Sequence, residues 1–125
     1  MEQSFLVVDD SKLARMVVRQ ALRELHPDCA IVEAANADEA DRLDGIVGLT
    51  AAFIDFNMPG EDGLELVARL RARRHDLPIA VVSANTQTDV LERARALGAV
   101  FLEKPLSQEA LAGFITAPPA QRHSA

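Results

Sequence analysis

Short apolar runs recur along this chain, and longer segments with a different spacing of apolar residues separate them. The runs cover residues 5–8, 30–32, 51–54, 79–82 and 100–102, and polar residues, Gly or Pro follow each one. Runs of this length that are bounded by turn residues are typical of strands buried on both faces. The pattern therefore predicts five buried strands.

Helical periodicity in the intervals predicts helices between the strands. The first helix has one apolar face, formed by Ala14, Val17, Val18, Ala21, Leu22 and Leu25. A stripe with this spacing is expected to lie against a sheet, and Pro27 marks the end of the helix. Asn36 followed by Glu39 resembles a capping box, which predicts a second helix that ends in the glycine-containing segment 45–48.

Three further helices follow from the same spacing. They are expected at residues 63–74, at residues 90–97 with Gly98 just beyond the end, and at residues 111–115. Strands that alternate with helices form a parallel sheet covered on both faces, because crossovers between parallel strands are right-handed. We therefore expect an α/β fold, a three-layer (βα)5 sandwich.

Length and composition are those of one domain. The chain has 125 residues, of which 49% are hydrophobic, and this is enough to bury a single core. We expect a free-standing domain at residues 1–116. The segment 117–125 contains Pro118 and Pro119 and is expected to be a flexible C-terminal tail.

The charge balance disfavours binding to nucleic acid. The chain has 13 Lys and Arg against 19 Asp and Glu, a formal charge of −6, which repels a phosphate backbone. Arg69, Arg71, Arg73 and Arg74 cluster on the third predicted helix. We interpret this cluster as the solvated face of that helix.

Cysteine content and the N-terminal residues point to the cytoplasm. Cys29 is the only cysteine, so an intrachain disulfide is impossible. The chain opens with Met1-Glu2-Gln3, unlike the basic start of a signal peptide, and no apolar run is long enough to span a membrane. We expect a cytoplasmic protein that contacts no membrane.

Residues that can carry chemistry directly follow the predicted strands. They are Asp9, Asp10, Asp55, Ser83 and Lys104. The carboxyl ends of parallel strands share one edge of the sheet, where ligands bind. Three carboxylates gathered there repel one another, and Mg²⁺ is the expected cation that neutralises them. Beside a metal and an ammonium group, a carboxylate can attack a phosphoryl group and form an acyl phosphate.

Each of these residues also has a purely structural interpretation. Asp9 and Asp10 could cap the first helix, and Asp55 could start a turn. Ser83 could be a turn hydroxyl, and Lys104 an ordinary surface charge. Their joint order after successive strands makes the functional interpretation the stronger one.

The same residues lie in motifs that resemble those of response regulator receiver domains. The motifs are Asp9-Asp10, residues 55–60 (Asp-Phe-Asn-Met-Pro-Gly), Asp62-Gly63, Ser83-Ala84 and Lys104-Pro105. The resemblance covers residues 4–115. It implies a CheY-like, flavodoxin-like sheet with strand order 2-1-3-4-5, and a phosphorylation-activated switch of a two-component system.

The resemblance implies a role for each acidic residue. Asp55 is the expected phosphoacceptor. Asp9, Asp10, Asp55 and the main-chain carbonyl of Asn57 are the expected ligands of Mg²⁺, with Asp9 acting largely through metal-bound water. Asn57 and Asn85 match positions that tune the rate of dephosphorylation.

The remaining site residues are expected to contact or sense the phosphoryl group. Ser83 matches the switch hydroxyl, and Lys104 is expected to pair with a phosphoryl oxygen, its peptide bond to Pro105 being cis. Phe101 matches an aromatic residue that turns inward once Ser83 has moved. Ala84 matches a small residue that leaves room for the phosphodonor.

The resemblance also implies partners. A sensor histidine kinase or a histidine phosphotransfer protein is expected to donate the phosphoryl group. A downstream protein target is expected on the face formed by the fourth helix, fifth strand and fifth helix. We expect a monomer or weak dimer that catalyses only its own phosphorylation and dephosphorylation.

Two alternatives differ in function. A phosphatase of the haloacid dehalogenase class also uses a strand-end Asp and Mg²⁺, but it needs an acid two residues after the nucleophile, where this chain has Asn57. A pseudo-receiver that acts as a constitutive scaffold would normally lack the acidic pair, the acceptor or the lysine. All of these are present in this chain.

Overall fold

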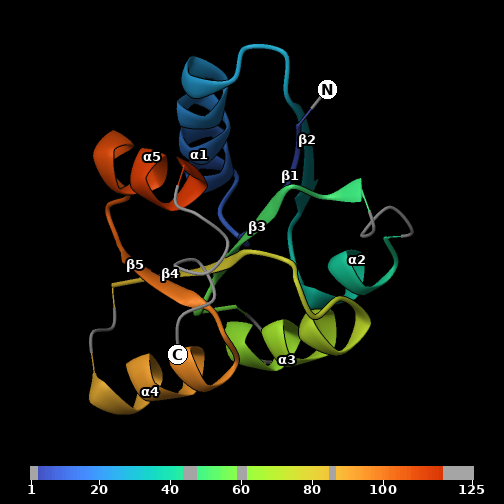
Figure 1. Ribbon diagram of the computed structural model, residues 1–125, viewed down its shortest axis with the longest axis vertical. Coiled ribbons are helices and arrows are strands. Elements are labelled where there is room, and N and C mark those ends of the chain that lie inside the picture. The colour runs from blue at the N-terminus through green and yellow to red at the C-terminus, as the bar shows by residue number, and fades with distance from the viewer. Residues whose placement is uncertain (1–2, 44–47, 59–61, 85–86, 117–125) are drawn as a thin grey trace.

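The computed structural model describes residues 3–43, 48–58, 62–84 and 87–116. Strands and helices alternate along this part of the chain (Figure 1). The strands are β1 (Ser4–Val8), β2 (Ala30–Ala34), β3 (Ala51–Asp55), β4 (Ile79–Ser83) and β5 (Val100–Glu103). The helices are α1 (Lys12–Leu25), α2 (Ala37–Asp41), α3 (Gly63–Arg73), α4 (Thr88–Ala96) and α5 (Gln108–Thr116).

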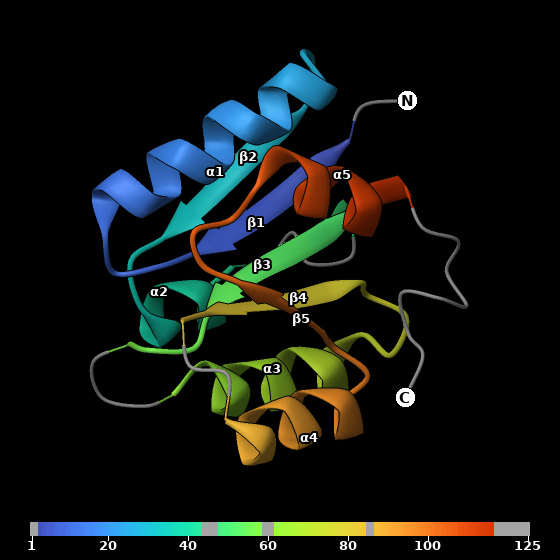
Figure 2. The ribbon, with the colours of Figure 1, turned by 90° about the vertical axis from the view of Figure 1, so that its left-hand side faces the viewer.

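All pairs of neighbouring strands are parallel, and the order in the sheet is β2-β1-β3-β4-β5. Helices α1 and α5 cover one face of the sheet, and α2, α3 and α4 cover the other (Figure 2). The predicted fold class and strand order are therefore confirmed. Because every strand runs the same way, the carboxyl ends of β1, β3, β4 and β5 meet at one edge.

Side chains that alternate along the strands supply a core to each face. Phe5, Val7 and Phe53 pack with α1 and α5, whereas Leu6 and Ile54 pack with the helices of the other face. Period-two alternation with apolar residues on both sides is what a doubly covered sheet requires. This explains why the strands appear in the sequence as unbroken apolar runs.

The second helix is shorter than predicted. Asn36 does cap it by accepting a hydrogen bond from the Glu39 amide, as expected. However, the helix ends at Asp41, so the predicted end in segment 45–48 is wrong. The next two amides, of Arg42 and Leu43, bond to carbonyls three residues back, and this tighter winding ends an α-helix. Residues 44–47 of the predicted end lie outside the described residues.

Two predictions about helix surfaces have different outcomes. Gly98 has φ +71°, a conformation that suits glycine just beyond a helix end, so the predicted end of α4 is confirmed.

Val17 was expected on the buried face of α1, but it is 50% exposed, and the buried residues of that helix are Val18 and Leu22. None of the described helices combines the length and apolar character needed to cross a bilayer.

The arginines of α3 and its C-cap are only in part a solvated face: Arg73 is exposed, but the prediction is wrong for Arg71 and Arg74, which are partly buried and bonded to backbone carbonyls. Arg71 donates to the backbone carbonyls of residues 74, 75, 77, 97 and 98. Arg73 donates to the Leu43 carbonyl, and Arg74 to the Leu49 carbonyl. Arginine has five N–H donors in a fixed fork, which suits several carbonyls at once. These side chains therefore tie α3 to neighbouring loops.

Candidate functional site

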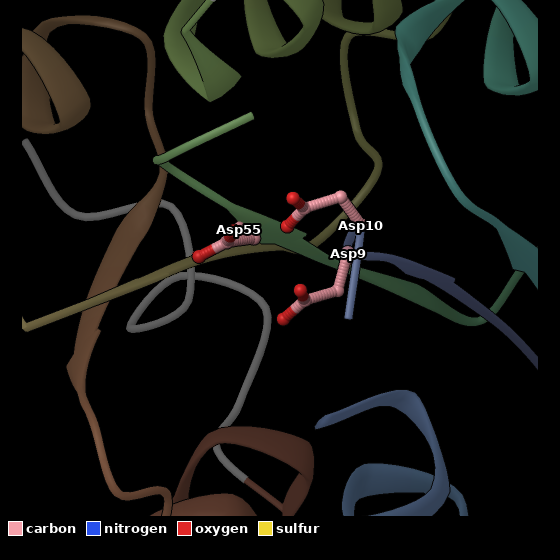
Figure 3. A group of neighbouring side chains, drawn as sticks. All are labelled: Asp9, Asp10 and Asp55. Atoms are coloured by element: carbon pink, nitrogen blue, oxygen red, sulfur yellow. The ribbon is translucent and has the colours of Figure 1, made fainter. Parts of the chain in front are cut away.

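Three carboxylates converge at the carboxyl edge of the sheet, as Figure 3 shows. Asp9 and Asp10 follow β1, and Asp55 is the last residue of β3. One oxygen from each lies within 4.8 Å of the others. Asp9 and Asp55 are buried and Asp10 is exposed. The structure thus brings together the three acidic residues that the sequence placed at strand ends.

Sheet register explains this convergence. Val8 on β1 lies opposite Ile54 on β3, so the next residues, Asp9 and Asp55, leave the sheet at the same level. The Asp9 carboxylate turns back to accept a hydrogen bond from the Ser11 amide at 2.9 Å. Ser11 is the N-cap of α1. The segment Asp9-Asp10, called the acidic loop below, therefore forms one hydrogen-bonded unit with the start of the helix.

Lys104 reaches the same carboxylates from the end of β5. Its Nζ lies 2.9 Å from Asp55 Oδ1 and 3.3 Å from Asp9 Oδ2. Its backbone amide donates to the Ser83 carbonyl at 3.0 Å, and its peptide bond to Pro105 is cis, as predicted. The Lys104 side chain therefore extends past the end of β4, and its ammonium lies beside the carboxylates of Asp9 and Asp55.

The site favours an added positive charge. Burial raises the pKa of Asp55, and the negative charges of Asp9 and Asp10 raise it further, although Lys104 opposes the shift. Burial lowers the pKa of Lys104, but its ion pairs with Asp55 and Asp9 outweigh this effect, so the net pKa is raised. One ammonium does not balance three carboxylates clustered in a site of reduced solvent access.

Asp55 Oδ1 is the best indication that a cation fits. This oxygen is buried, and no group in the described part of the chain donates a hydrogen bond to it. Its one close cationic neighbour among the described residues is the Lys104 ammonium, which forms an ion pair with it at 2.9 Å. Buried carboxylate oxygens are rarely left without a partner. A set of carboxylate oxygens at this spacing is a donor set that hard divalent cations prefer.

The other predicted residues surround this cluster. Ser83 is fully buried at the end of β4, one residue beyond the partner of Asp55 in the sheet. Ala84 follows it and is exposed, Asn57 is exposed two residues after β3, and Pro105 is exposed after Lys104. Phe101, in β5, is partly buried and packs against the core beneath α3 and α4. Asn85 lies outside the described residues.

Gly63 determines how closely α3 approaches the end of β3. Its amide donates to the Phe56 carbonyl at 2.8 Å. A Cβ at residue 63 would lie 2.3 Å from the Asp55 backbone oxygen. Only glycine allows this approach, because a methyl group would overlap the strand. The next helix is therefore packed directly against the backbone of the candidate acceptor.

An apolar cavity of about 470 Å³ opens beside the carboxylates, and the sequence interpretation did not identify it. It is lined by Asp9, Asp55 and Lys104, by apolar residues of β1, β3 and β4, and by side chains of α1 and the β5–α5 connection. Leu13 and Val17 are 70% and 50% exposed at its rim. The signal in the sequence was the spacing of Leu13, Met16 and Val17, which forms a second apolar edge on α1.

Comparisons with known proteins agree on one family. The family model of the response regulator receiver domain matches residues 5–116 of this chain. Transcriptional regulatory protein PdtaR of Mycobacterium tuberculosis is 34% identical over 103 residues, which cover 82% of this chain and 49% of PdtaR. The C4-dicarboxylate transport transcriptional regulatory protein DctD of Pseudomonas aeruginosa is 33% identical, over 85% of this chain and 23% of DctD. The chain thus spans half or less of these relatives.

Solved structures show the same fold. A CheY-like receiver domain protein from Methanospirillum hungatei superposes with a TM-score of 0.83 at 21% identity, over 98% of this chain and 97% of that one. The chemotaxis protein CheY4 of Vibrio cholerae has a TM-score of 0.79 at 25% identity, over 98% and 99%.

Proposed function

This chain belongs to the response regulator receiver domain family, and from that membership we propose that Asp55 accepts a phosphoryl group and that the phosphorylated form signals by contact with another protein. Receiver domains are signalling modules of two-component systems. The observation that carries the proposal is the placement of Asp55, which is buried beside Asp9 and Asp10 with Lys104 Nζ 2.9 Å from its Oδ1. This arrangement has a nucleophile and groups of both charges around it.

We assign the cation of this site as Mg²⁺. The side chains of Asp9, Asp10 and Asp55 would hold it together with the main-chain carbonyl of Asn57. When bound, Mg²⁺ supplies positive charge that offsets the repulsion between a carboxylate and an incoming phosphoryl group. The Oδ1 of Asp55, which is buried and ion-paired with Lys104 but accepts no hydrogen bond in the described part of the chain, supports this assignment.

The chain's own residues then have distinct roles. An Asp55 carboxylate oxygen forms a bond to phosphorus, while the bond from phosphorus to the donor breaks and the donor leaves with its electron pair. The Lys104 ammonium shifts from the carboxylate to a phosphoryl oxygen, and the Ser83 hydroxyl donates to another. Ala84, small and exposed, leaves the approach open. Phe101 would turn inward once Ser83 has moved toward the phosphoryl group, and this would alter the face of α4, β5 and α5, where a target protein would bind.

The phosphodonor protein would dock on α1. Leu13, Met16 and Val17 are exposed apolar side chains of that helix, and the cavity that Leu13 and Val17 line extends to Asp55. An exposed apolar patch continuous with a reactive carboxylate fits a protein that must deliver a phosphoryl group there. A sensor histidine kinase or a histidine phosphotransfer protein has the required phosphohistidine.

Phosphorylation with a small phosphodonor and Mg²⁺ tests the assignment. We expect one acyl phosphate, stable in acid and labile in base, that is absent from Asp55→Asn. Label that persists in that variant would refute Asp55 as the acceptor.

The docking surface is tested with Leu13→Glu, which should retain labelling by the small donor and lose labelling by the protein donor.

The phosphatase alternative is not favoured. That class needs a general acid two residues after the nucleophile, and Asn57 cannot donate a proton to a leaving alkoxide. We expect no turnover of phosphomonoesters with Mg²⁺, which a standard release assay measures. The constitutive scaffold is also not favoured, because the acidic pair, the acceptor and the lysine lie together.

A further inference from the structure

Arg15 lies in the first turn of α1, close to the acidic loop of Asp9 and Asp10. Its Nη1 donates to the backbone carbonyl of Asp9, and its Nε donates to Glu33 Oε1 at 3.0 Å. The other oxygen of Glu33 accepts from Arg19 Nη1 at 2.9 Å. The Arg15 side chain is only 14% exposed. It therefore connects β2 with the loop that carries the acidic pair.

The bond to the Asp9 carbonyl acts on the peptide group between Asp9 and Asp10. The Asp9 amide donates to the Ala34 carbonyl at 3.1 Å, so this residue is held on its N-terminal side by β2. Arg15 holds it on the C-terminal side. The orientation of this planar peptide group sets ψ of Asp9 and φ of Asp10. Holding the carbonyl therefore determines where the Asp10 side chain starts.

Asp10 depends on this arrangement more than its neighbour does. The Asp9 carboxylate is held by the Ser11 amide and by Lys104. No hydrogen bond or ion pair from the rest of the described chain holds the Asp10 carboxylate, which is exposed. Among the described groups, only the backbone at Asp10 therefore sets the position from which this carboxylate extends.

We propose that Arg15 is a positioning residue of the cation site, and that Glu33 orients its guanidinium group. The inference rests on the proposed function, because it concerns Mg²⁺ binding to the same carboxylates. A guanidinium group can bind a carboxylate along one edge and a carbonyl with another N–H, which an ammonium cannot do in a fixed geometry. Groups that orient metal ligands typically change metal affinity by about 10–100-fold when they are removed.

Calorimetric titration with Mg²⁺ tests the proposal, and Arg19 provides the matched control. Arg19 binds the same carboxylate as Arg15 but does not contact Asp9. We expect Arg15→Gln and Arg15→Lys to weaken Mg²⁺ binding by about tenfold or more. We expect Arg19→Gln to stay within about twofold of the original chain, because the Asp9 carbonyl keeps its donor. Circular dichroism establishes that each variant is folded.

Three results would overturn the proposal. They are unchanged Mg²⁺ affinity in folded Arg15→Lys, an equal loss in Arg19→Gln, and an absence of Mg²⁺ binding by the original chain. Small-donor labelling over a range of Mg²⁺ concentrations, carried out alongside, should show that Arg15→Lys needs more Mg²⁺ for half-maximal labelling. Label that survives in Asp55→Asn would instead refute the acceptor assignment and leave the calorimetric comparison valid.

Discussion

Gly63 lies so close to Asp55 that a Cβ on residue 63 would be 2.3 Å from the Asp55 backbone oxygen. The same Cβ would be 3.0 Å from the Asp55 carbonyl carbon and from Phe56 Cα. All three of these atoms belong to the backbone, so no side chain can rotate away. The start of α3 and the end of β3 are therefore coupled sterically.

We expect Gly63→Ala to destabilise the protein by about 1–3 kcal/mol, because the added methyl group forces α3 away from β3. Alanine's higher helix propensity, worth about 1 kcal/mol, opposes this effect only in part. Chemical denaturation measures the change. The matched control is Gly113→Ala in α5, where a Cβ meets no atom within 4 Å and should stabilise by about 0.5–1 kcal/mol. Equal stabilisation by both substitutions would contradict the steric argument.

Asp55→Asn should be more stable than the original chain at pH 7 in EDTA. The pKa of Asp55 is raised by burial above 3.8, so the fold binds its proton more tightly than the unfolded chain does. The free-energy cost of burying its charge is therefore absent below pH 3.8. It grows as the pH rises from 3.8 to the raised pKa, and it remains at neutral pH.

Thermal denaturation of both proteins at pH 7 and near pH 3.5 tests this expectation. A gain of about 1 kcal/mol corresponds to roughly 4 °C in a domain of this size. The difference should shrink at the acidic pH and also when Mg²⁺ is added, because the cation stabilises the charged form. A variant less stable than the original chain at pH 7 in EDTA would count against the raised pKa.

Lys104→Ala should affect stability and signalling in separable ways. Without Mg²⁺, its loss leaves the carboxylates of Asp9 and Asp55 without their cationic partner, so we expect a lower melting temperature in EDTA. The pKa of Lys104 is raised above 10.5, so its stabilising contribution is complete below that pH and lost at higher pH. The difference from the original chain should therefore close in alkaline buffer.

With Mg²⁺, we expect Lys104→Ala to bind the cation at least as tightly as the original chain, because a competing ammonium is gone. Phosphorylation should no longer be coupled to the change at Phe101. Calorimetry measures the first effect, and target binding by the phosphorylated variant measures the second. Normal target binding would show that Lys104 does not transmit the signal.

Arg71→Lys should destabilise the protein by about 2–3 kcal/mol. The guanidinium group donates to five backbone carbonyls, and a lysine ammonium has fewer donors and a different geometry. The control is Arg69→Lys on the same helix, where one partner is the exposed carboxylate of Asp41 and the expected change is below about 1 kcal/mol. Urea denaturation compares the two, and similar losses would refute the role of the carbonyls.

Much of the fold and the acidic cluster could be predicted, because both depend on local pattern. Apolar runs indicated the strands, and residues that follow parallel strands must share an edge of the sheet, which brought Asp9 and Asp55 together. The bonds of Arg71 and Arg15 could not be predicted. The five bonds of Arg71, and the bond from Arg15 to Asp9, end on backbone carbonyls, which every residue has, so no side chain marks these partners. The exposed position of Val17 likewise depends on how α1 lies on the sheet.

The attachment of Arg71 to the carbonyls of Leu97 and Gly98 has a mechanical consequence for α4. This helix of nine residues is about 13 Å long and is tethered at its C-terminal end. If it tilts, that end acts as the pivot, and the opposite end, toward Ser83, sweeps the widest arc. A target protein that distinguishes the two tilts would therefore do so best by binding the N-terminal half of α4, where the displacement is largest.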